Sequence, residues 1–277
     1  MHLSEINTYP IKSLGGVSIK KSIVENRGLQ FDRRWMLIDE QNRFLTQRNF
    51  PKMATVAVKI IGGGLRVLSG SETLDVSFEP ATYETSSVKI WSSRCRALIY
   101  EEKVNEWFSD VLETNCRLVL MPEETIRRVN YFYAVHRDDA VSFADAHPFL
   151  LAGENSLADL NARLDAPVSM NRFRANFVVS DSESFAEDDW KKIKIGECVF
   201  HVVKPCARCV VTTIDQNEGI KTGVEPLKTL ATYRIPKRSV KKKILFGQYL
   251  IAENAGAVLN VGDKIEVVET KNSPEFR

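Results

Sequence analysis

The sequence predicts a mainly β fold of the α+β kind, in which a small N-terminal β-barrel or sandwich packs on a second β-barrel with peripheral helices. Short segments rich in β-branched residues recur about every 6–12 residues up to residue 95, with Gly, Asn, Asp or Pro between them. Strand patterns return in the second half, and helical periodicity is confined to a few short stretches. A chain of 277 residues fits one large domain or two modest ones. We therefore predict one unit over residues 1–95 and another over residues 97–270.

The N-terminal strands are predicted from alternating or β-branched sequence bounded by turn residues. They cover residues 3–11, 17–25, 33–41, 53–61, 64–69, 73–78 and 87–91. Short strands at this spacing are typical of a small barrel or sandwich.

Two helices are predicted in the middle of the chain. Residues 103–113 place Val104, Trp107, Phe108 and Leu112 on one helical face. Residues 156–164 do the same with three leucines, and Ser156 is a candidate N-cap. The polar, aromatic stretch 122–149 between them predicts a long loop, and long loops in compact domains are often functional.

Strand patterns resume after the second helix. The predicted strands are residues 173–180, 193–203, 209–215 and 263–269. A third helix is predicted over residues 225–234, with Pro226 at a position in the first turn that tolerates proline. The pattern of strands and helices over residues 97–270 therefore predicts a second β-barrel with peripheral helices.

Composition excludes several classes of protein. With 44% hydrophobic and 27% charged residues the chain is typical of a soluble globular protein, and its net charge of +2 argues against nucleic-acid binding. No apolar run reaches the roughly 18 residues of a membrane helix, so we expect no membrane association. The N-terminus is too polar for a signal peptide, which predicts a cytoplasmic location. Five scattered cysteines, an odd number, predict reduced thiols.

One basic segment, Lys237–Lys243, carries five positive charges in seven residues. Two interpretations remain open. It is either a solvated loop or a docking patch for an acidic partner or an anion.

The pair Cys206 and Cys209 in "KPCARCVVTTID" is the main candidate for chemistry. A zinc site needs about four ligands and this pair supplies two, while a dithiol pair of the thioredoxin kind precedes a helix rather than the strand predicted here. Arg208 would favour a thiolate at Cys209 by its charge, and Cys206 could be a small buried apolar residue. Spacing alone does not select among a zinc half-site, a redox pair, and one ligand beside a bystander.

Several motifs occur in order along the chain: "TYPIKSLGG…FDRRWMLIDEQNRFLTQR", "NRFRANFVVS" with "WKKIKIGE", "PCARCVVTTID", "LFGQYLIAEN" and "VGDKIEV". The last four resemble the MOSC domain, named after the C-terminal domain of molybdenum-cofactor sulfurases. The first resembles the β-barrel domain that precedes it in one branch of the family. That branch includes the mitochondrial amidoxime-reducing component and its bacterial relatives. The resemblance runs nearly from end to end.

This resemblance implies a molybdenum cofactor, with no pyridoxal phosphate, and makes Cys209 the protein ligand of the metal and Cys206 a bystander. A soft thiolate suits such a metal, and the anionic cofactor needs cationic partners. The implied cofactor-binding positions are Lys12, Ser13, Arg33, Asp145, His147, Arg174, Asn176, Arg208 and Tyr249. The family relative compared has Ser where this chain has His147.

Each position also has a structural alternative. Lys12 and Ser13 could form a polar loop, and Tyr249 a packed core residue. Arg174 and Asn176 would share one strand face, either toward the ligand or as a surface stripe. Of the adjacent Arg33 and Arg34, the resemblance selects Arg33 and leaves Arg34 solvated or ion-paired.

The implied activity is reduction of small N-hydroxylated compounds such as amidoximes, hydroxylamines and N-hydroxylated base analogues. Some bacterial relatives carry a plant-type ferredoxin domain, but its cysteine spacing is absent here. Electrons would therefore come from a separate reductase or a small iron–sulfur or haem protein. The alternative is a non-catalytic carrier of the cofactor, or of sulfur on Cys209.

Overall fold

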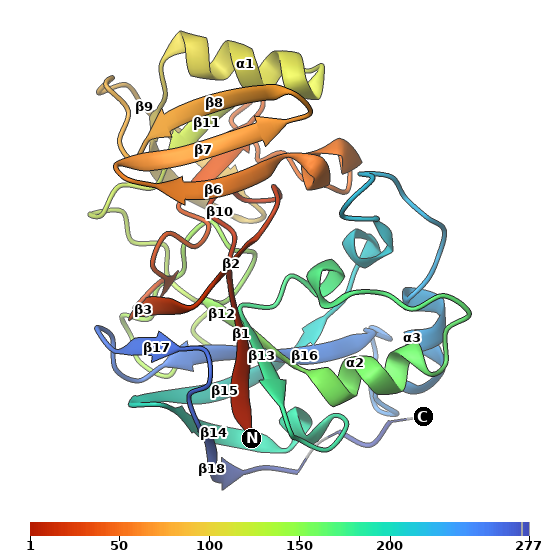
Figure 1. Ribbon diagram of the computed structural model, residues 1–277. Helices are drawn as coiled ribbons and strands as arrows, with labels where there is room; N and C mark the ends of the chain where they lie inside the picture. Colours follow the sequence, from red (N-terminus) through yellow and green to blue (C-terminus); the bar gives the residue numbers. More distant parts are fainter. Residues whose placement is uncertain (273, 277) are drawn as a thin grey trace.

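The computed structural model describes residues 1–272 and 274–276 and contains two β-rich units, one above the other in Figure 1. The lower unit is built on an eight-stranded sheet in the order β18-β14-β15-β16-β12-β13-β1-β2. Its strands are β1 (His2–Thr8), β2 (Val17–Ile19), β12 (Phe149–Gly153), β13 (Phe177–Ser180), β14 (Trp190–Ile195), β15 (Cys198–Ala207), β16 (Leu245–Ala252) and β18 (Ile265–Thr270). The rings of Phe149, Phe177 and Phe200 meet at 5.3–5.6 Å in its core.

The upper unit contains two smaller sheets. The first has the order β5-β11-β10-β9 and the second β6-β7-β8. Their strands are β5 (Trp35–Ile38), β6 (Ala57–Ile61), β7 (Gly64–Ser69), β8 (Glu72–Ser77), β9 (Thr85–Ile90), β10 (Ser93–Ile99) and β11 (Arg117–Leu120). Helix α1 (Glu102–Leu112) buries Val104, Phe108, Val111 and Leu112 against this unit. The predicted mainly β fold is therefore confirmed.

The N-terminal strands connect the two units. Strand β1 pairs with β13 in the large sheet, and β3 (Lys21–Glu25) pairs with both β17 (Val258–Asn260) and β4 (Gly28–Leu29). At the C-terminal end of the upper unit, strand β10 crosses the boundary that the sequence predicts between residues 95 and 97, and it pairs with both β9 and β11. We therefore propose that the upper unit continues to β11, beyond the limit expected from the sequence.

Two short helices lie on the lower unit. Helix α2 (Glu154–Asn161) has Gly153 as its N-cap, so the prediction of Ser156 as N-cap is wrong. Ser156 lies inside the helix, where its buried hydroxyl donates to Glu187 Oε1 at 2.8 Å. Helix α3 (Leu227–Tyr233) is confirmed, with Pro226 as its N-cap. The 3-10 turns are η1 (Pro51–Thr55), η2 (Met170–Phe173), η3 (Ala186–Asp188) and η4 (Val210–Thr213).

The strand predicted over residues 209–215 is wrong. Strand β15 ends at Ala207, and Cys209 is the N-cap of the 3-10 helix η4. The hydroxyls of Thr212 and Thr213 donate to the carbonyls of Cys209 and Val210, at 3.0 and 2.8 Å. These local bonds curl the chain after the cysteine instead of extending it.

The predicted long loop is present between β11 and β12. Apart from a single bridge between Arg128 and Ala140, the described residues from 121 to 148 form no regular element. The loop ends beside the large sheet and places Asp145 and His147 in the cavity described below. Among the described residues, no helix is long and apolar enough to cross a membrane.

Candidate functional site

A cavity lies where the two units meet, and both contribute to its walls. The upper unit and its N-terminal connection provide Lys12, Ser13, Arg33, Thr46, Gln47 and Arg48. The lower unit and the long loop provide Ala144, Asp145, His147, Leu150, Arg172, Phe173, Arg174, Asn176, Cys206, Ala207, Arg208, Cys209, Val211, Thr212 and Tyr249. Every site residue predicted from the sequence is in this lining. Segments far apart in the chain therefore converge on one hollow.

The lining is strongly cationic. Its basic members are Lys12, Arg33, Arg48, Arg172, Arg174 and Arg208, and Asp145 is its one carboxylate among the described residues. The Nη2 groups of Arg174 and Arg208 are buried and have no hydrogen-bond partner in the part of the chain that the structure describes. A buried guanidinium N–H without a partner is costly. The cavity is therefore suited to an anionic ligand that accepts these bonds.

Strained backbone contributes to the placement of three of these residues. Ser13, Arg33 and Arg174 adopt the left-handed region, with φ of 70°, 49° and 53°. Such conformations cost about 1–3 kcal/mol each and cluster at ligand sites. Arg33 and Arg174 thus reach the cavity from turns. The expectation that Arg174 and Asn176 share one face of a strand is wrong, because both residues precede strand β13.

Arg33 and Arg174 both lie over the ring of Tyr9, with their guanidinium carbons 4.4 and 4.2 Å from its centre. Arg33 also forms an ion pair with Asp32 at 2.6 Å and donates to Asn176 Oδ1 at 3.2 Å. Burial lowers the pKa of Arg174 to about 10, although Tyr9 and Asp32 oppose the shift. The arrangement orders two like charges side by side, which a bound anion would stabilise.

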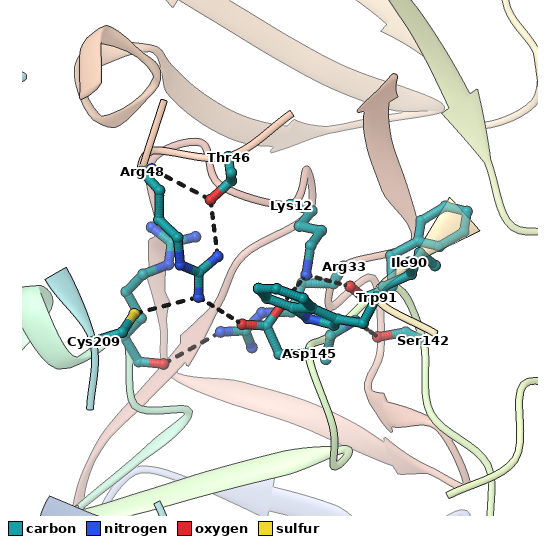
Figure 2. Close-up of polar contacts among 12 residues, drawn as sticks. Lys12, Arg33, Thr46, Arg48, Ile90, Trp91, Ser142, Asp145 and Cys209 are labelled. Atoms are coloured by element: carbon teal, nitrogen blue, oxygen red, sulfur yellow. Dashed lines mark hydrogen bonds and ion pairs between the residues drawn. The ribbon is translucent and has the colours of Figure 1, made fainter. Parts of the chain in front are cut away.

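Asp145 lies between the cationic side chains of Lys12 and Arg48 (Figure 2). It accepts a hydrogen bond from Lys12 Nζ and lies 3.5 Å from Arg48 Nη2. Burial opposes its ionisation, but Lys12 and Arg48 outweigh burial and hold the pKa of this carboxyl well below its ordinary value. Burial lowers the pKa of Lys12 to about 8, against the attraction of Asp145.

The two cysteines of the pair occupy different environments. Cys206 is buried at the end of β15, and burial raises the pKa of its thiol. Cys209 follows the strand and is half-buried at the cavity, where Arg48 Nη2 donates to its sulfur at 3.3 Å (Figure 2). Arg208 instead donates to the carbonyls of Phe246 and Phe173, both at 2.8 Å. The cation in contact with Cys209 is therefore Arg48, which the sequence reasoning missed.

The stacked rings of His147 and Tyr249 form part of the cavity lining. The imidazole of His147 stacks on Tyr249 at 4.7 Å and is 4% exposed. Neither ring nitrogen has a hydrogen-bond partner among the described residues. Burial and the charge of Lys204 lower the pKa of His147 to about 4, so the ring is neutral near pH 7.

Comparison with known proteins matches the chain over nearly its whole length. The profile of the MOSC N-terminal beta barrel domain matches residues 1–115, and that of the MOSC domain matches residues 138–266. Mitochondrial amidoxime-reducing component 1 of Mus musculus is 34% identical over 95% of this chain and 81% of its own length. The chain belongs to the MOSC-domain family.

Other MOSC relatives differ in length. Mitochondrial amidoxime-reducing component 1 of Homo sapiens is 32% identical over 95% of this chain and 82% of its own length. A molybdenum cofactor sulfurase of Oryza sativa subsp. japonica is 32% identical over 96% of this chain but only 35% of its own length. This MOSC protein thus corresponds to about a third of that sulfurase. The family resemblance inferred from the sequence motifs is confirmed.

The MOSC cavity also includes residues that the motifs did not single out. Arg48 ends the N-terminal motif "FLTQR", and Arg172 opens "RFRANF". Both therefore lie inside matching segments, and a search for further cations in those segments would have found them. Arg34, in contrast, lies outside the cavity, buried in an ion pair with Glu25. Among the described residues, no group of three or more His, Cys, Asp or Glu side chains is placed to hold a metal ion.

Proposed function

We propose that this protein binds the molybdenum cofactor in the cavity between its two units and uses it to reduce small N-hydroxylated compounds. The observation that carries the proposal is the joint placement in one cavity of the half-buried Cys209 and the buried Nη2 atoms of Arg174 and Arg208, which have no hydrogen-bond partner among the described residues. A thiolate provides a soft metal ligand, and the guanidinium groups provide donors for an anion. The names of the relatives support the same proposal.

The residues of the cavity fit both the anionic organic part of the cofactor and its metal. Lys12, Arg33, Arg174 and Arg208, with Ser13, Asn176 and Tyr249, would hold the anionic organic part, and the unpartnered Nη2 atoms would gain acceptors. Cys209 would hold the metal. When bound, the cofactor supplies two-electron oxygen-atom transfer chemistry, and the protein orients the group and adjusts the charge around it.

The remaining polar residues have separate roles in this proposal. Asp145 stays ionised between Lys12 and Arg48, so it orients these cations and does not act as an acid. His147 is neutral near pH 7 and holds one proton on a ring nitrogen for which the described residues provide no acceptor. It could donate that hydrogen bond to the cofactor or to the substrate.

The proposal includes a separate electron donor. The basic segment Lys237–Lys243 is largely exposed, and it leads into Ile244, whose carbonyl accepts the backbone N–H of Arg208 at 2.8 Å. Its charge would attract an acidic iron–sulfur or haem protein near the cavity. The cytoplasmic location stays a prediction.

The activity is tested by assaying the purified protein, produced in a molybdenum-replete host, for reduction of benzamidoxime with an artificial electron donor. We expect turnover in the wild type, loss of turnover in Cys209→Ser and turnover close to wild type in Cys206→Ser. Bound molybdenum without turnover of any N-hydroxylated compound would contradict the reductase and favour the carrier.

A further inference from the structure

A second hollow adjoins the cavity on the upper unit. We call it the outer groove, and its lining includes Phe44, Arg48, Phe50, Lys89, Trp91 and Asn115. Thr46 and Arg48 line both the outer groove and the cavity. The two hollows therefore share a wall, and that wall includes the side chain that contacts Cys209.

Trp91 is fixed at the inner end of the outer groove. It lies in the turn between β9 and β10 with φ of 54°, and its indole N–H donates to Asp145 Oδ1 at 3.2 Å. The guanidinium carbon of Arg48 lies 4.8 Å from the centre of the indole ring, and the ring of Phe44 lies 5.2 Å away. The long loop, the upper unit and the cavity wall thus hold one aromatic side chain in place (Figure 2).

Despite these contacts, Trp91 remains 48% exposed. Trp35 and Trp190, in contrast, are 2% and 4% exposed. An ordered, half-exposed indole offers a large apolar surface at little cost in conformational entropy. Such a surface is suited to contact with a flat ligand.

The outer groove lies close to the cysteine that would hold the metal. Arg48 contacts Cys209 Sγ at 3.3 Å through Nη2 and packs on Trp91 with the same guanidinium. One guanidinium therefore contacts both the indole of Trp91 and the sulfur of Cys209. A substrate whose N–O group reached the metal would bring its other end to this wall.

We propose that the outer groove binds the non-reacting part of the substrate, with Trp91 as its apolar wall, and that it selects flat aryl groups over small aliphatic ones. This inference rests on the proposed function. The aryl group would contact the indole and Phe44, and the planar guanidinium of Arg48 would lie between it and the cysteine. Trp91 is thus a specificity-determining residue.

The test compares kcat/KM for benzamidoxime with kcat/KM for N-methylhydroxylamine within each variant, so that incomplete cofactor loading cancels. We expect Trp91→Ala to lower this ratio about tenfold. Trp91→Phe, which keeps a ring but loses the N–H to Asp145, should keep the ratio within about twofold of wild type. Tyr83→Ala serves as the matched control, because Tyr83 is 95% exposed and outside the groove. An unchanged ratio in Trp91→Ala would overturn the inference.

Binding of benzamide, a flat uncharged probe, separates this inference from the proposed function. Calorimetry should show binding to the wild type and to Trp91→Phe, and binding at least about tenfold weaker to Trp91→Ala. Acetamide should bind none of the three measurably. If the wild type reduces neither substrate, the proposed reductase fails, while benzamide binding that depends on Trp91 still supports the groove. Equal benzamide affinity in all variants, or none in the wild type, would overturn the groove.

Discussion

Lys12 is a buried side chain that loses its positive charge between about pH 7 and pH 9. Burial lowers its pKa to about 8 in the folded protein, although Asp145 opposes the shift. We expect the cofactor-free protein to bind inorganic pyrophosphate about tenfold more weakly at about pH 9 than at about pH 7, since Lys12 loses its charge over this interval. Calorimetry at the two pH values measures the change.

Lys12→Arg is the matched control for that prediction, because a guanidinium keeps its charge throughout this range. The variant should bind pyrophosphate with a nearly constant affinity. A wild-type affinity that does not change with pH, or the same loss in wild type and Lys12→Arg, would contradict the role given to Lys12.

His147 makes stability depend on pH in the acid range. Its pKa is about 4 when folded and about 6.5 in a solvated chain, so the unfolded state takes up the proton first. The stability that depends on a neutral His147 is present above about pH 6.5 and is lost as the pH falls toward 4. Linkage predicts a loss of about 3 kcal/mol in the free energy of unfolding relative to His147→Gln between about pH 7 and pH 4.

Urea unfolding of wild type, His147→Gln and His136→Gln at a series of pH values measures this loss. His136 is exposed, so its variant should follow the wild type. Parallel curves for wild type and His147→Gln would show that the imidazole is not held neutral.

The contact between Arg48 and Cys209 is one that the sequence did not predict. The resemblance assigned Cys209, but no local pattern indicated which cation meets its sulfur. Arg208 is adjacent in sequence, yet its guanidinium donates to the carbonyls of Phe173 and Phe246. Arg48 reaches the sulfur across 161 residues of sequence separation, which only the tertiary fold determines.

At the scale of elements, strands with clear alternation were predicted well and the segment after Cys209 was not. β7 has the predicted bounds, and α1 buries the predicted apolar face except for the half-buried Trp107. The β-branched run after Cys209 has strand propensity, but the hydroxyls of Thr212 and Thr213 bond to preceding carbonyls and form a 3-10 turn. The strand propensity of these residues was therefore outweighed by local hydrogen bonds from their side chains.

The basic segment Lys237–Lys243 leads to a prediction about electron delivery. The double variant Lys241→Glu, Lys242→Glu should lower the rate of benzamidoxime reduction with an acidic [2Fe–2S] ferredoxin about tenfold at low ionic strength, because it reverses two charges of the segment proposed to dock the donor. The rate with an artificial small-molecule donor should not change. Stopped-flow or steady-state assays with both donors measure the difference.

Lys20→Glu, Lys21→Glu makes the same charge change at two other exposed lysines. It should leave the ferredoxin-dependent rate near that of the wild type, and added salt should remove the difference between the two double variants. An equal loss in both would show that net charge, and not this segment, controls the rate.

At the scale of the whole molecule, the cavity lies between two units, which the sequence predicts as residues 1–95 and 97–270. Periodicity predicted two β-rich units, but it did not show that β1 joins the sheet of the lower unit or that β10 and β11 continue the upper one. Both are long-range pairings, which local pattern does not encode. The distant motifs identified part of the cavity lining, since family resemblance carries the tertiary arrangement that periodicity lacks.

The central claim is that Cys209 anchors a molybdenum cofactor in this cavity, and the metal content of the purified protein tests it most directly. Elemental analysis of wild type, Cys209→Ser and Cys206→Ser from a molybdenum-replete host should find about one molybdenum per chain in wild type and Cys206→Ser. Cys209→Ser should contain little or none. A wild type without molybdenum, or a Cys209→Ser variant that retains it fully, would contradict the account.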